Sequence, residues 1–319
     1  MTLELSRRGS VFLAMALIVS SASLTASCGG GGGGGGGGGV AGPTTGTISG
    51  TATKGPVSGG TVTAYAISNG MKGGRLGSAQ TDSGGNFMIT VPAYSGSVML
   101  EMHGGSYMDE ATGTRMSMLN SDDMACVLSS VNVTAGSAMT GIQITPLTSM
   151  AHAWAGHMAG GMTMTNIETA NSHVGAHYVG PGADILMTHP IDPTVAGSAN
   201  GASIHAKNYG MMLAAMSQEA HDLGMTTSSS AMVTAMLDDA TDGIMDGMMS
   251  GAAINMSGMG GMMGGGSMNM MPTAGTSQLA TAMATFVSGP MNHSGVTSVT
   301  EMQSLMDQMT ELAAAGGHL

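Results

Sequence analysis

An unbroken run of glycines from Gly29 to Gly39 divides the sequence into two parts. The run itself has no side chains with which to join a hydrophobic core. Glycine loses more backbone entropy on ordering than any other residue, and the run has no side chains whose burial could offset that loss. A glycine-rich chain of this length behaves as a random coil with an end-to-end distance of roughly 20 Å. We therefore predict that residues 28–46 form a flexible tether ahead of a folded remainder.

The segment before the tether has the pattern of a bacterial secretion signal. Arg7 and Arg8 precede an apolar run, Val11 to Val19, that is too short to span a bilayer. Small residues follow, and LTASC, ending at Cys28, resembles the lipobox of bacterial lipoproteins. The resemblance implies that residues 1–27 are removed, that Cys28 is lipidated, and that the protein is exported and anchored to the cell envelope. Because Gly29 follows the cysteine, it implies delivery to the outer membrane or cell surface.

The charge of the chain argues against nucleic acid as a partner. The formal net charge is −12 at pH 7, whereas a phosphate-binding protein needs a basic face that displaces counterions. With Cys28 lipidated, Cys126 has no partner for an intrachain disulfide, and we expect it to be a small buried apolar residue. The basic residues that remain beyond the signal are few and scattered along the sequence: Lys54, Lys72, Arg75, Arg115 and Lys207.

Residues 47–145 have the pattern of a small β-domain. Thr61 to Ile67 alternates Thr or Tyr with Val or Ala, which is typical of a strand with one buried face. Further short alternating runs follow, separated by turn residues such as Asn69-Gly70 and Gly84-Gly85. The spacing of these runs predicts an antiparallel β-sandwich.

Two motifs extend this interpretation. KGPVSGGTVTAY, from Lys54 to Tyr65, and TDSGGNF, from Thr81 to Phe87, resemble the carboxypeptidase regulatory-like, or transthyretin-like, β-sandwich family. The resemblance covers about a third of the chain. It implies that Asp82 caps a hairpin turn, that Gly85 adopts a conformation closed to other residues, and that Phe87 points into the core. Members of that family usually serve as accessory or binding modules and have no catalytic apparatus of their own.

Residues 146–319 are predicted to form a Met-rich helical region, which makes the fold class α+β. Thr145-Pro146 is a helix start, and the capping boxes at Thr165 and Ser298 mark two more. Apolar stripes predict further helices near 209–223 and 229–237. Methionine occupies stripe positions where leucine would serve, so core packing accounts for these residues. They include Met150, Met158, Met212, Met216, Met302, Met306 and Met309.

Between residues 245 and 275 methionine is mixed with glycine and serine without a sustained period, which predicts a flexible Met-Gly segment with accessible thioethers. Thioether sulfur is a soft, neutral donor that selects Cu(I) or Ag(I), and the Met-x-Met and Met-x-x-Met spacings resemble those of bacterial periplasmic copper- and silver-handling proteins. Two other interpretations stay open: a sacrificial methionine oxidant sink and a linker of drifting composition. The candidate ligands are Met256, Met259, Met262, Met263, Met268, Met270 and Met271.

Histidines and acids supply weaker candidates. His173 and His177 are four residues apart on a predicted helix, so both imidazoles could reach one Cu(II) ion, although such a pair is commonly a polar face. The loop that contains Asp109 and Glu110 is expected to be solvated or to contact a cation. The acidic stretch Asp238 to Gly247 departs from the calcium-loop template and suits an acidic helix end followed by a glycine stop.

The functional expectation is a lipid-anchored binding protein and not an enzyme. The sequence has no nucleophile elbow, zinc-protease motif, phosphate-binding loop or haem-attachment motif. The leading hypothesis is sequestration or delivery of Cu(I) or Ag(I) through thioethers, with copper as the expected cofactor and the membrane as a partner through Cys28. The alternative is a surface scaffold or an adhesion and assembly module in which methionine only packs.

Overall fold

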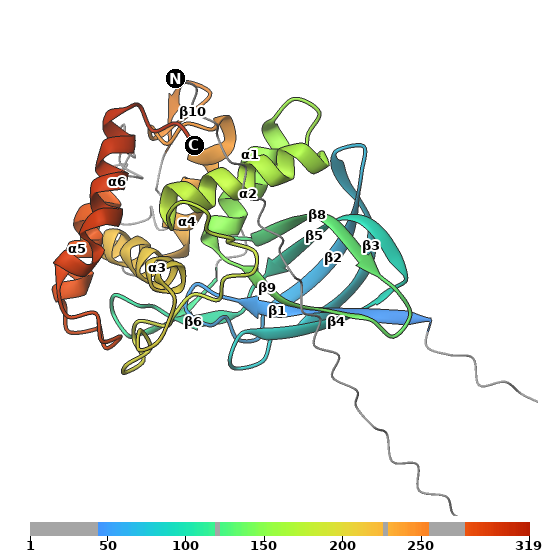
Figure 1. The fold of residues 1–319 in the computed structure, drawn as a ribbon, viewed down its shortest axis with the longest axis horizontal. Coiled ribbons are helices and arrows are strands. Elements are labelled where there is room, and N and C mark those ends of the chain that lie inside the picture. The colour runs from blue at the N-terminus through green and yellow to red at the C-terminus, as the bar shows by residue number, and fades with distance from the viewer. Residues whose placement is uncertain (1–43, 119–121, 226–228, 255–277) are drawn as a thin grey trace, which may run out of the picture. The chain divides into compact units, whose positions relative to one another are not determined.

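A computed structural model describes residues 44–118, 122–225, 229–254 and 278–319. Its fold is α+β, with the strands first and the helices second, as the sequence predicts. Residues Ala41–Leu319 make up one compact unit, in which the change from strand to helix falls at Thr145 (Figure 1). The tether glycines, Cys28 and the signal lie outside the described residues.

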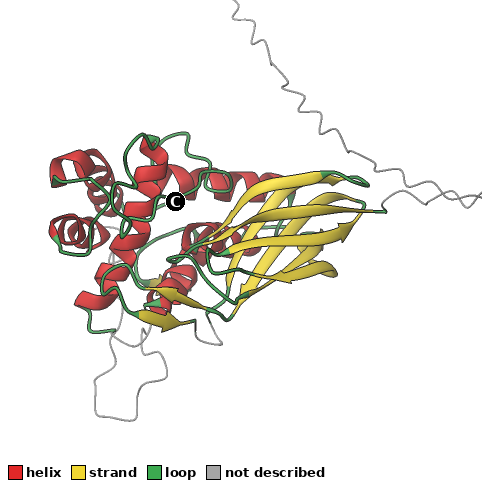
Figure 2. Ribbon diagram, turned by 90° about the horizontal axis from the view of Figure 1, so that it is seen from below, coloured by secondary structure: helices red, strands yellow, loops and turns green. Residues whose placement is uncertain are grey.

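Two β-sheets pack on each other in the first half (Figure 2). The four-stranded sheet has the order β3-β2-β5-β8 and is antiparallel throughout, and the three-stranded sheet has the order β4-β1-β9. A short hairpin, β6-β7, lies beside them. The strands are β1 (Thr45–Ala52), β2 (Thr61–Ser68), β3 (Met71–Gln80), β4 (Asn86–Pro92), β5 (Tyr94–His103), β6 (Ser106–Met108), β7 (Arg115–Ser117), β8 (Met124–Val133) and β9 (Ala138–Ile144).

The prediction of an entirely antiparallel arrangement is wrong at one place. Strands β1 and β9 pair in parallel, with Thr47 opposite Ala138. Parallel strands need a long crossover, which the whole intervening chain provides. At Gly50 the two strands come so close that a Cβ atom would lie 1.8 Å from the carbonyl oxygen of Ile142, so the pairing depends on glycine there.

Alternation explains how the sheets share their core. In β4, Phe87, Ile89 and Val91 are buried while the residues between them are exposed, which is the period of two that the sequence shows. Cys126 lies in the same core with no exposed surface, as expected, and burial raises the pKa of its thiol to about 12.

The turn before β4 has the geometry expected from the transthyretin-like resemblance. The Asp82 carboxylate accepts hydrogen bonds from the main-chain amides of Gly84, at 2.8 Å, and Asn86, at 2.9 Å. Gly85 has a φ of +78°, and a Cβ there would lie 2.5 Å from the carbonyl oxygen of Ala52. Phe87 points inward. All three expected roles are confirmed.

Helices cover the outer face of the four-stranded sheet and continue beyond it (Figure 1). Met99, Ala125 and Val127 of that sheet belong to the helical core and not to the core between the sheets. One set of helices therefore completes the burial of the sheet. The helices are α1 (Pro146–His157), α2 (Met164–Tyr178), α3 (Ile204–Asp222), α4 (Ser230–Asp239), α5 (Leu279–Ser288) and α6 (Gln303–Ala314), with the 3-10 turns Ala240–Asp242 and Val299–Met302.

The helix starts follow side-chain capping, with one shift. Thr145 is the N-cap of α1, as predicted, and it also forms a capping box with Thr148. Ser298 forms the predicted capping box with Glu301. Helix α2 begins about half a turn earlier than expected. Its N-cap is Thr163 and not Thr165, because the Thr163 hydroxyl accepts the hydrogen bond from the Asn166 amide. The stripe methionines pack as predicted, and Met150, Met212 and Met309 have no exposed surface.

The predicted flexible segment from residue 245 is wrong for its first ten residues. Met245 is fully buried in the helical core, and β10 (Met248–Met249) pairs with β11 (Ala252–Ala253). Asp239 holds this turn, since its Oδ1 atom accepts hydrogen bonds from the amides of Asp246 and Gly247. The rest of the Met-Gly segment, including all seven candidate methionine ligands, lies outside the described residues.

A buried ionic network joins the strands to α3. Lys54 has no exposed surface, and its Nζ lies 3.0 Å from Oε2 of Glu110 and contacts the Ser217 hydroxyl of α3. The Glu110 carboxylate also accepts hydrogen bonds from the Gly55 amide, at 2.8 Å, and from Ser217, at 2.5 Å. Asp109 accepts from Ser229 beside α4, at 2.6 Å. The expectation of a solvated loop at Asp109 and Glu110 is wrong, because the helices cover both carboxylates.

Candidate functional site

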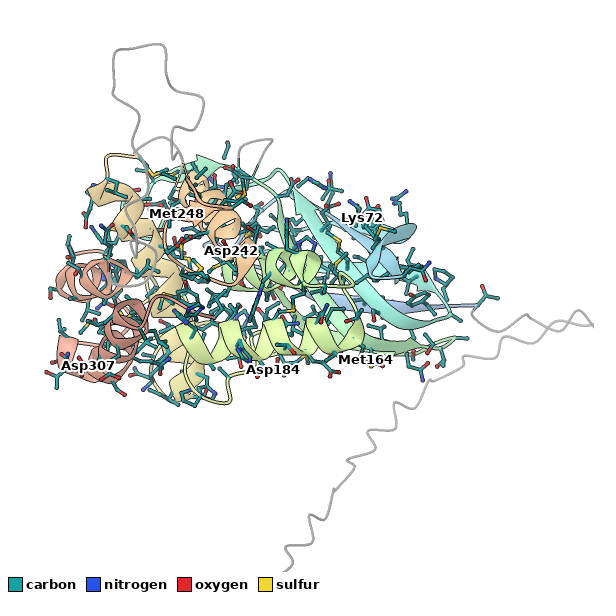
Figure 3. The ribbon with its side chains drawn as sticks, turned by 90° about the horizontal axis from the view of Figure 1, so that it is seen from above. Lys72, Met164, Asp184, Asp242, Met248 and Asp307 are labelled. Atoms are coloured by element: carbon teal, nitrogen blue, oxygen red, sulfur yellow. The ribbon has the colours of Figure 1, made fainter. Side chains whose placement is uncertain are left out.

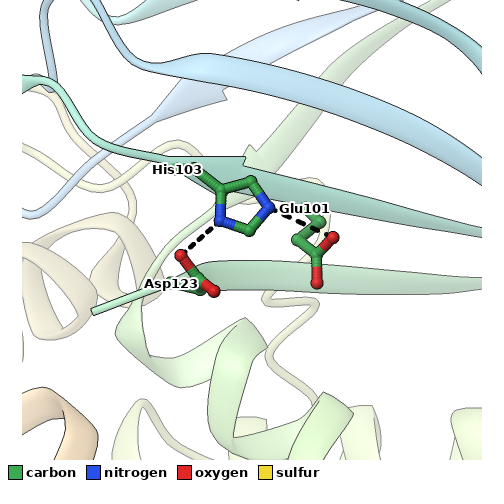
Figure 4. Close-up of side chains that lie close together, drawn as sticks. All are labelled: Glu101, His103 and Asp123. Carbon is green, nitrogen blue, oxygen red and sulfur yellow. Dashed lines mark hydrogen bonds and ion pairs between the residues drawn. The ribbon is translucent and has the colours of Figure 1, made fainter. Parts of the chain in front are cut away.

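The alternation of β5 places ligand-type side chains on the face of the sheet that the helices partly cover. Met99 lies on this face beneath the helices, so Glu101 and His103, two and four residues later, lie on the same face nearer its edge. Asp123 stands immediately before β8, which pairs with β5 so that Glu101 is opposite Ala125. Figure 4 shows the result: the His103 ring lies between the carboxylates of Glu101 and Asp123.

The three side chains form a compact cluster, the Glu101–His103–Asp123 triad. Nε2 of His103 lies 3.2 Å from Oε2 of Glu101, and Nδ1 of His103 contacts the Asp123 carboxylate. One ligand atom from each residue lies within 4.8 Å of the other two. The side chain of Glu101 is 13% exposed, whereas those of His103 and Asp123 are 46% and 41% exposed. The cluster is therefore anchored at one end and open to solvent at the other.

A lysine balances the charge of the triad. The Lys72 ammonium pairs with the Glu101 carboxylate and lies 4.2 Å from the centre of the Tyr65 ring, on the neighbouring strand β2. Partial burial alone would raise the pKa of Glu101, but hydrogen bonds and charge attraction from Lys72 and His103 outweigh it and lower that pKa. The Glu101 side chain is thus ionised at pH 7, with Lys72 and His103 as its partners.

A further imidazole approaches from α1. Thr148 and Ser149 bond to the main chain of Ala125, which is the register partner of Glu101, so His152 comes one turn later close to the triad. Burial lowers the pKa of His152 to about 4, and the Glu101 carboxylate offsets only part of that effect. The His152 side chain is therefore neutral at pH 7, as a metal-binding imidazole must be.

This arrangement can bind a divalent transition ion. One imidazole nitrogen and two carboxylates are the donors that Zn²⁺ and its neighbours accept, and the exposed side leaves a position for water. The sequence contained a signal that could have found the site, since Glu101 and His103 have the spacing of strand neighbours on one face. Asp123 carried no such signal, because it joins them only through the pairing of β5 with β8.

The predicted histidine pair lies elsewhere, on α2, and its two members differ. His173 is exposed and its ring lies edge-on to Trp154, with the ring centres 5.6 Å apart. His177 is 3% exposed and lies against Tyr178. Among the described residues, the triad is the set of three His, Cys, Asp or Glu side chains whose ligand atoms already lie within 4.8 Å.

The acidic stretch Asp238 to Gly247 caps its own backbone. Asp242 accepts from the Ile244 amide, at 3.0 Å, and Asp246 accepts from the Met248 amide, at 2.9 Å. Gly243, with a φ of +81°, ends the helical segment, as the glycine-stop interpretation predicts. In Figure 3, Asp242 and Met248 lie in the helical part of the unit, whereas Lys72 lies among the strands.

No protein-family model matches the chain, and neither does any curated protein sequence. Among solved structures, a similarity is found to a 9R-lipoxygenase from Cyanothece PCC8801. It has a TM-score of 0.18 and 11% sequence identity, and covers 61% of this chain and 24% of the lipoxygenase chain. Among the described helices, none combines the length and hydropathy that crossing a bilayer requires.

Proposed function

We propose that this chain is a metal-binding protein whose structured site is the Glu101–His103–Asp123 triad. The observation that carries the proposal is the convergence of one imidazole and two carboxylates within 4.8 Å at the open edge of a rigid sheet. An incoming ion replaces two contacts of the cluster: the Lys72 ammonium on Glu101 and one of the two nitrogen–carboxylate contacts of His103. The proposal assigns binding, and not catalysis, to the site.

The remainder of the functional proposal rests on the sequence. Secretion and lipidation at Cys28 would hold the unit at the cell envelope, and the seven methionines from Met256 to Met271 would add a soft-donor set for Cu(I) or Ag(I). The transthyretin-like family is proposed for the strand half, and the confirmed roles of Asp82, Gly85 and Phe87 support it. The scaffold and oxidant-sink alternatives predict that the protein binds no metal.

A direct test is a titration of the full chain with Zn²⁺ followed by calorimetry. We expect one equivalent of Zn²⁺ to bind at the triad, and Asp123→Asn or His103→Ala to weaken that binding by about 10–100-fold or more. Loss of a residue that only hydrogen-bonds to a metal ligand already weakens binding by that factor, and these variants remove a ligand itself. Both side chains are partly exposed, so the variants should fold normally. Equal affinity in the natural chain and both variants would remove the triad from consideration.

Two controls separate the sites. A variant with leucine at the seven methionines should keep its Zn²⁺ affinity, since thioethers are poor ligands for Zn²⁺ in competition with carboxylate and imidazole. The same variant in a competition titration with Cu(I) and a chromophoric chelator tests the thioether proposal. If it competes as well as the natural chain, the methionines are linker or packing residues.

Lys72 provides a second prediction, in the opposite direction. Lys72→Met removes the cation that competes for the Glu101 carboxylate, and we expect Zn²⁺ to bind about fivefold more tightly, the factor that the loss of one partly exposed ion pair allows. The matched control is Arg75→Met, which removes one positive charge from the same strand at a side chain that bonds to Ser78. A similar gain in both variants would mean that net charge, and not competition at Glu101, sets the affinity.

A further inference from the structure

A groove lies between α2, α6 and the residues that follow α6, and its lining contains no residue of the triad. Its volume is about 520 Å³, and three of the residues that line it are histidines: His173, His177 and His318. Gln308 of α6 fixes the groove, since its amide donates to the carbonyl oxygens of Ala176, at 2.6 Å, and His177, at 3.0 Å. The remaining lining is mainly apolar, so imidazole is the main metal-ligating group in it.

His177 is oriented by its surroundings. Its side chain is 3% exposed, its ring lies against Tyr178, and the ring donates a hydrogen bond to the main chain of His318. In a neutral imidazole that donates from one nitrogen, the other nitrogen carries a lone pair. An N–H held by a main-chain carbonyl is the usual arrangement behind a metal-bound histidine, because it fixes the ring orientation and the tautomer.

The other two histidines can move. His173 lies one helical turn before His177 on the same wall of the groove and is exposed. His318 is also exposed and is brought to the groove by the bridge between its backbone and Ile244. Their ring nitrogens do not yet lie within 4.8 Å of one another and of His177. Exposed side chains change rotamer within nanoseconds, so both rings are free to turn about χ1 and χ2.

We propose that His173, His177 and His318 bind one Cu²⁺ ion in this groove, as a second site that is independent of the triad. His177 is the fixed ligand, and His173 and His318 close on the ion from the two sides. Imidazole nitrogens bind Cu²⁺ more tightly than the other divalent first-row ions. The geometry thus extends the helical histidine pair by a third residue that sequence spacing could not bring to it.

The chain carries its own probe for this site. Trp154 is its only tryptophan, and the Trp154 ring contacts the His173 ring. Cu²⁺ bound by His173 should quench the fluorescence of Trp154, saturating at one equivalent. We use the full chain with Glu101→Gln and Asp123→Asn, which disables the triad. His173→Gln and His318→Ala should each weaken the Cu²⁺ affinity obtained from the quenching titration by about 10–100-fold. His293→Gln, at another exposed histidine, should leave that affinity unchanged.

Electron paramagnetic resonance of the same samples at one equivalent of Cu²⁺ gives a second readout. We expect hyperfine coupling to several imidazole nitrogens in the triad-disabled chain, and fewer in His173→Gln and His318→Ala. The proposal is overturned if the isotherm and the nitrogen coupling are the same with and without these two histidines, or if neither quenching nor nitrogen coupling occurs. Zn²⁺ binding at the triad is measured separately, so failure of either site leaves the other interpretable.

Discussion

Lys54→Met should lower the free energy of unfolding by about 3–5 kcal/mol, because it leaves the buried Glu110 carboxylate without its counter-charge. Lys54 has no exposed surface and Glu110 is 2% exposed, so solvent cannot replace the lost partner. The measurement is chemical denaturation at pH 7 of the natural chain and the variant. Lys207→Met, at a partly exposed lysine outside this network, is the control and should change stability by less than about 1 kcal/mol.

The pH dependence of this pair follows from its charges. Burial alone would lower the pKa of Lys54, but attraction from Glu110, Tyr107 and Asp109 outweighs it and raises the pKa above 10.5. A raised lysine pKa contributes stability that is fully present below pH 10.5 and is lost only as the pH rises through the folded-state value. The cost of Lys54→Met should therefore be constant between pH 6 and pH 9.

The double variant Lys54→Met, Glu110→Met separates the pair from its packing. Replacing both buried charges with apolar side chains is often neutral, so we expect most of the lost stability to return. A double variant as unstable as Lys54→Met alone would show that the side-chain volumes and the Ser217 hydrogen bonds, and not the charges, hold the strands to α3.

The second large effect is expected at Glu219 of α3. Its side chain is buried, and neither carboxylate oxygen has a hydrogen-bond partner in the described part of the chain. Burial, with a smaller contribution from Asp222, raises the pKa of Glu219 to about 8 from 4.5. Between these values the folded chain holds a proton that the unfolded chain releases, so stability falls as the pH rises through this window.

Glu219→Gln removes this titration. We expect the variant to be more stable than the natural chain by about 4 kcal/mol at pH 8, and close to it at pH 4, where both unfolded and folded Glu219 are protonated. Denaturant midpoints measured across this range give the two pH profiles. Glu311→Gln, at an exposed residue of α6, serves as the comparison and should leave the natural profile unchanged. Parallel profiles for Glu219→Gln and the natural chain would refute the prediction.

The parts of the fold that were predictable are those fixed by local pattern. Alternation identified β4, and the caps at Thr145 and Ser298 identified two helix starts. The first turn of α3, from Ile204, was missed because its residues show no apolar stripe, and α5 was missed because it follows the glycine-rich stretch directly. The parallel pairing of β1 with β9 has no local signal, since it depends on residues far apart in the chain.

The candidate sites divide in the same way. The spacing of His173 and His177 is a helical signal and was found, whereas His318 reaches them only through tertiary packing. The burial of Asp109 and Glu110 was mispredicted because a loop with two acids is usually solvated, and only the cover from α3 and α4 makes them internal. Residue type indicated the chemistry, but the tertiary fold decided which residues meet.

The parallel β1–β9 pair also has a consequence for how fast the chain can fold. Strand β1 is the middle strand of its sheet, and it receives one neighbour, β4, early and the other, β9, only after the rest of the strands. Contacts between residues so distant in sequence slow folding, because the loop must be closed before the pairing stabilises it. Until residues 138–144 arrive, the β9 side of β1 presents unpaired amides and carbonyls, and a chain stalled before that point is the form most prone to aggregate through edge pairing.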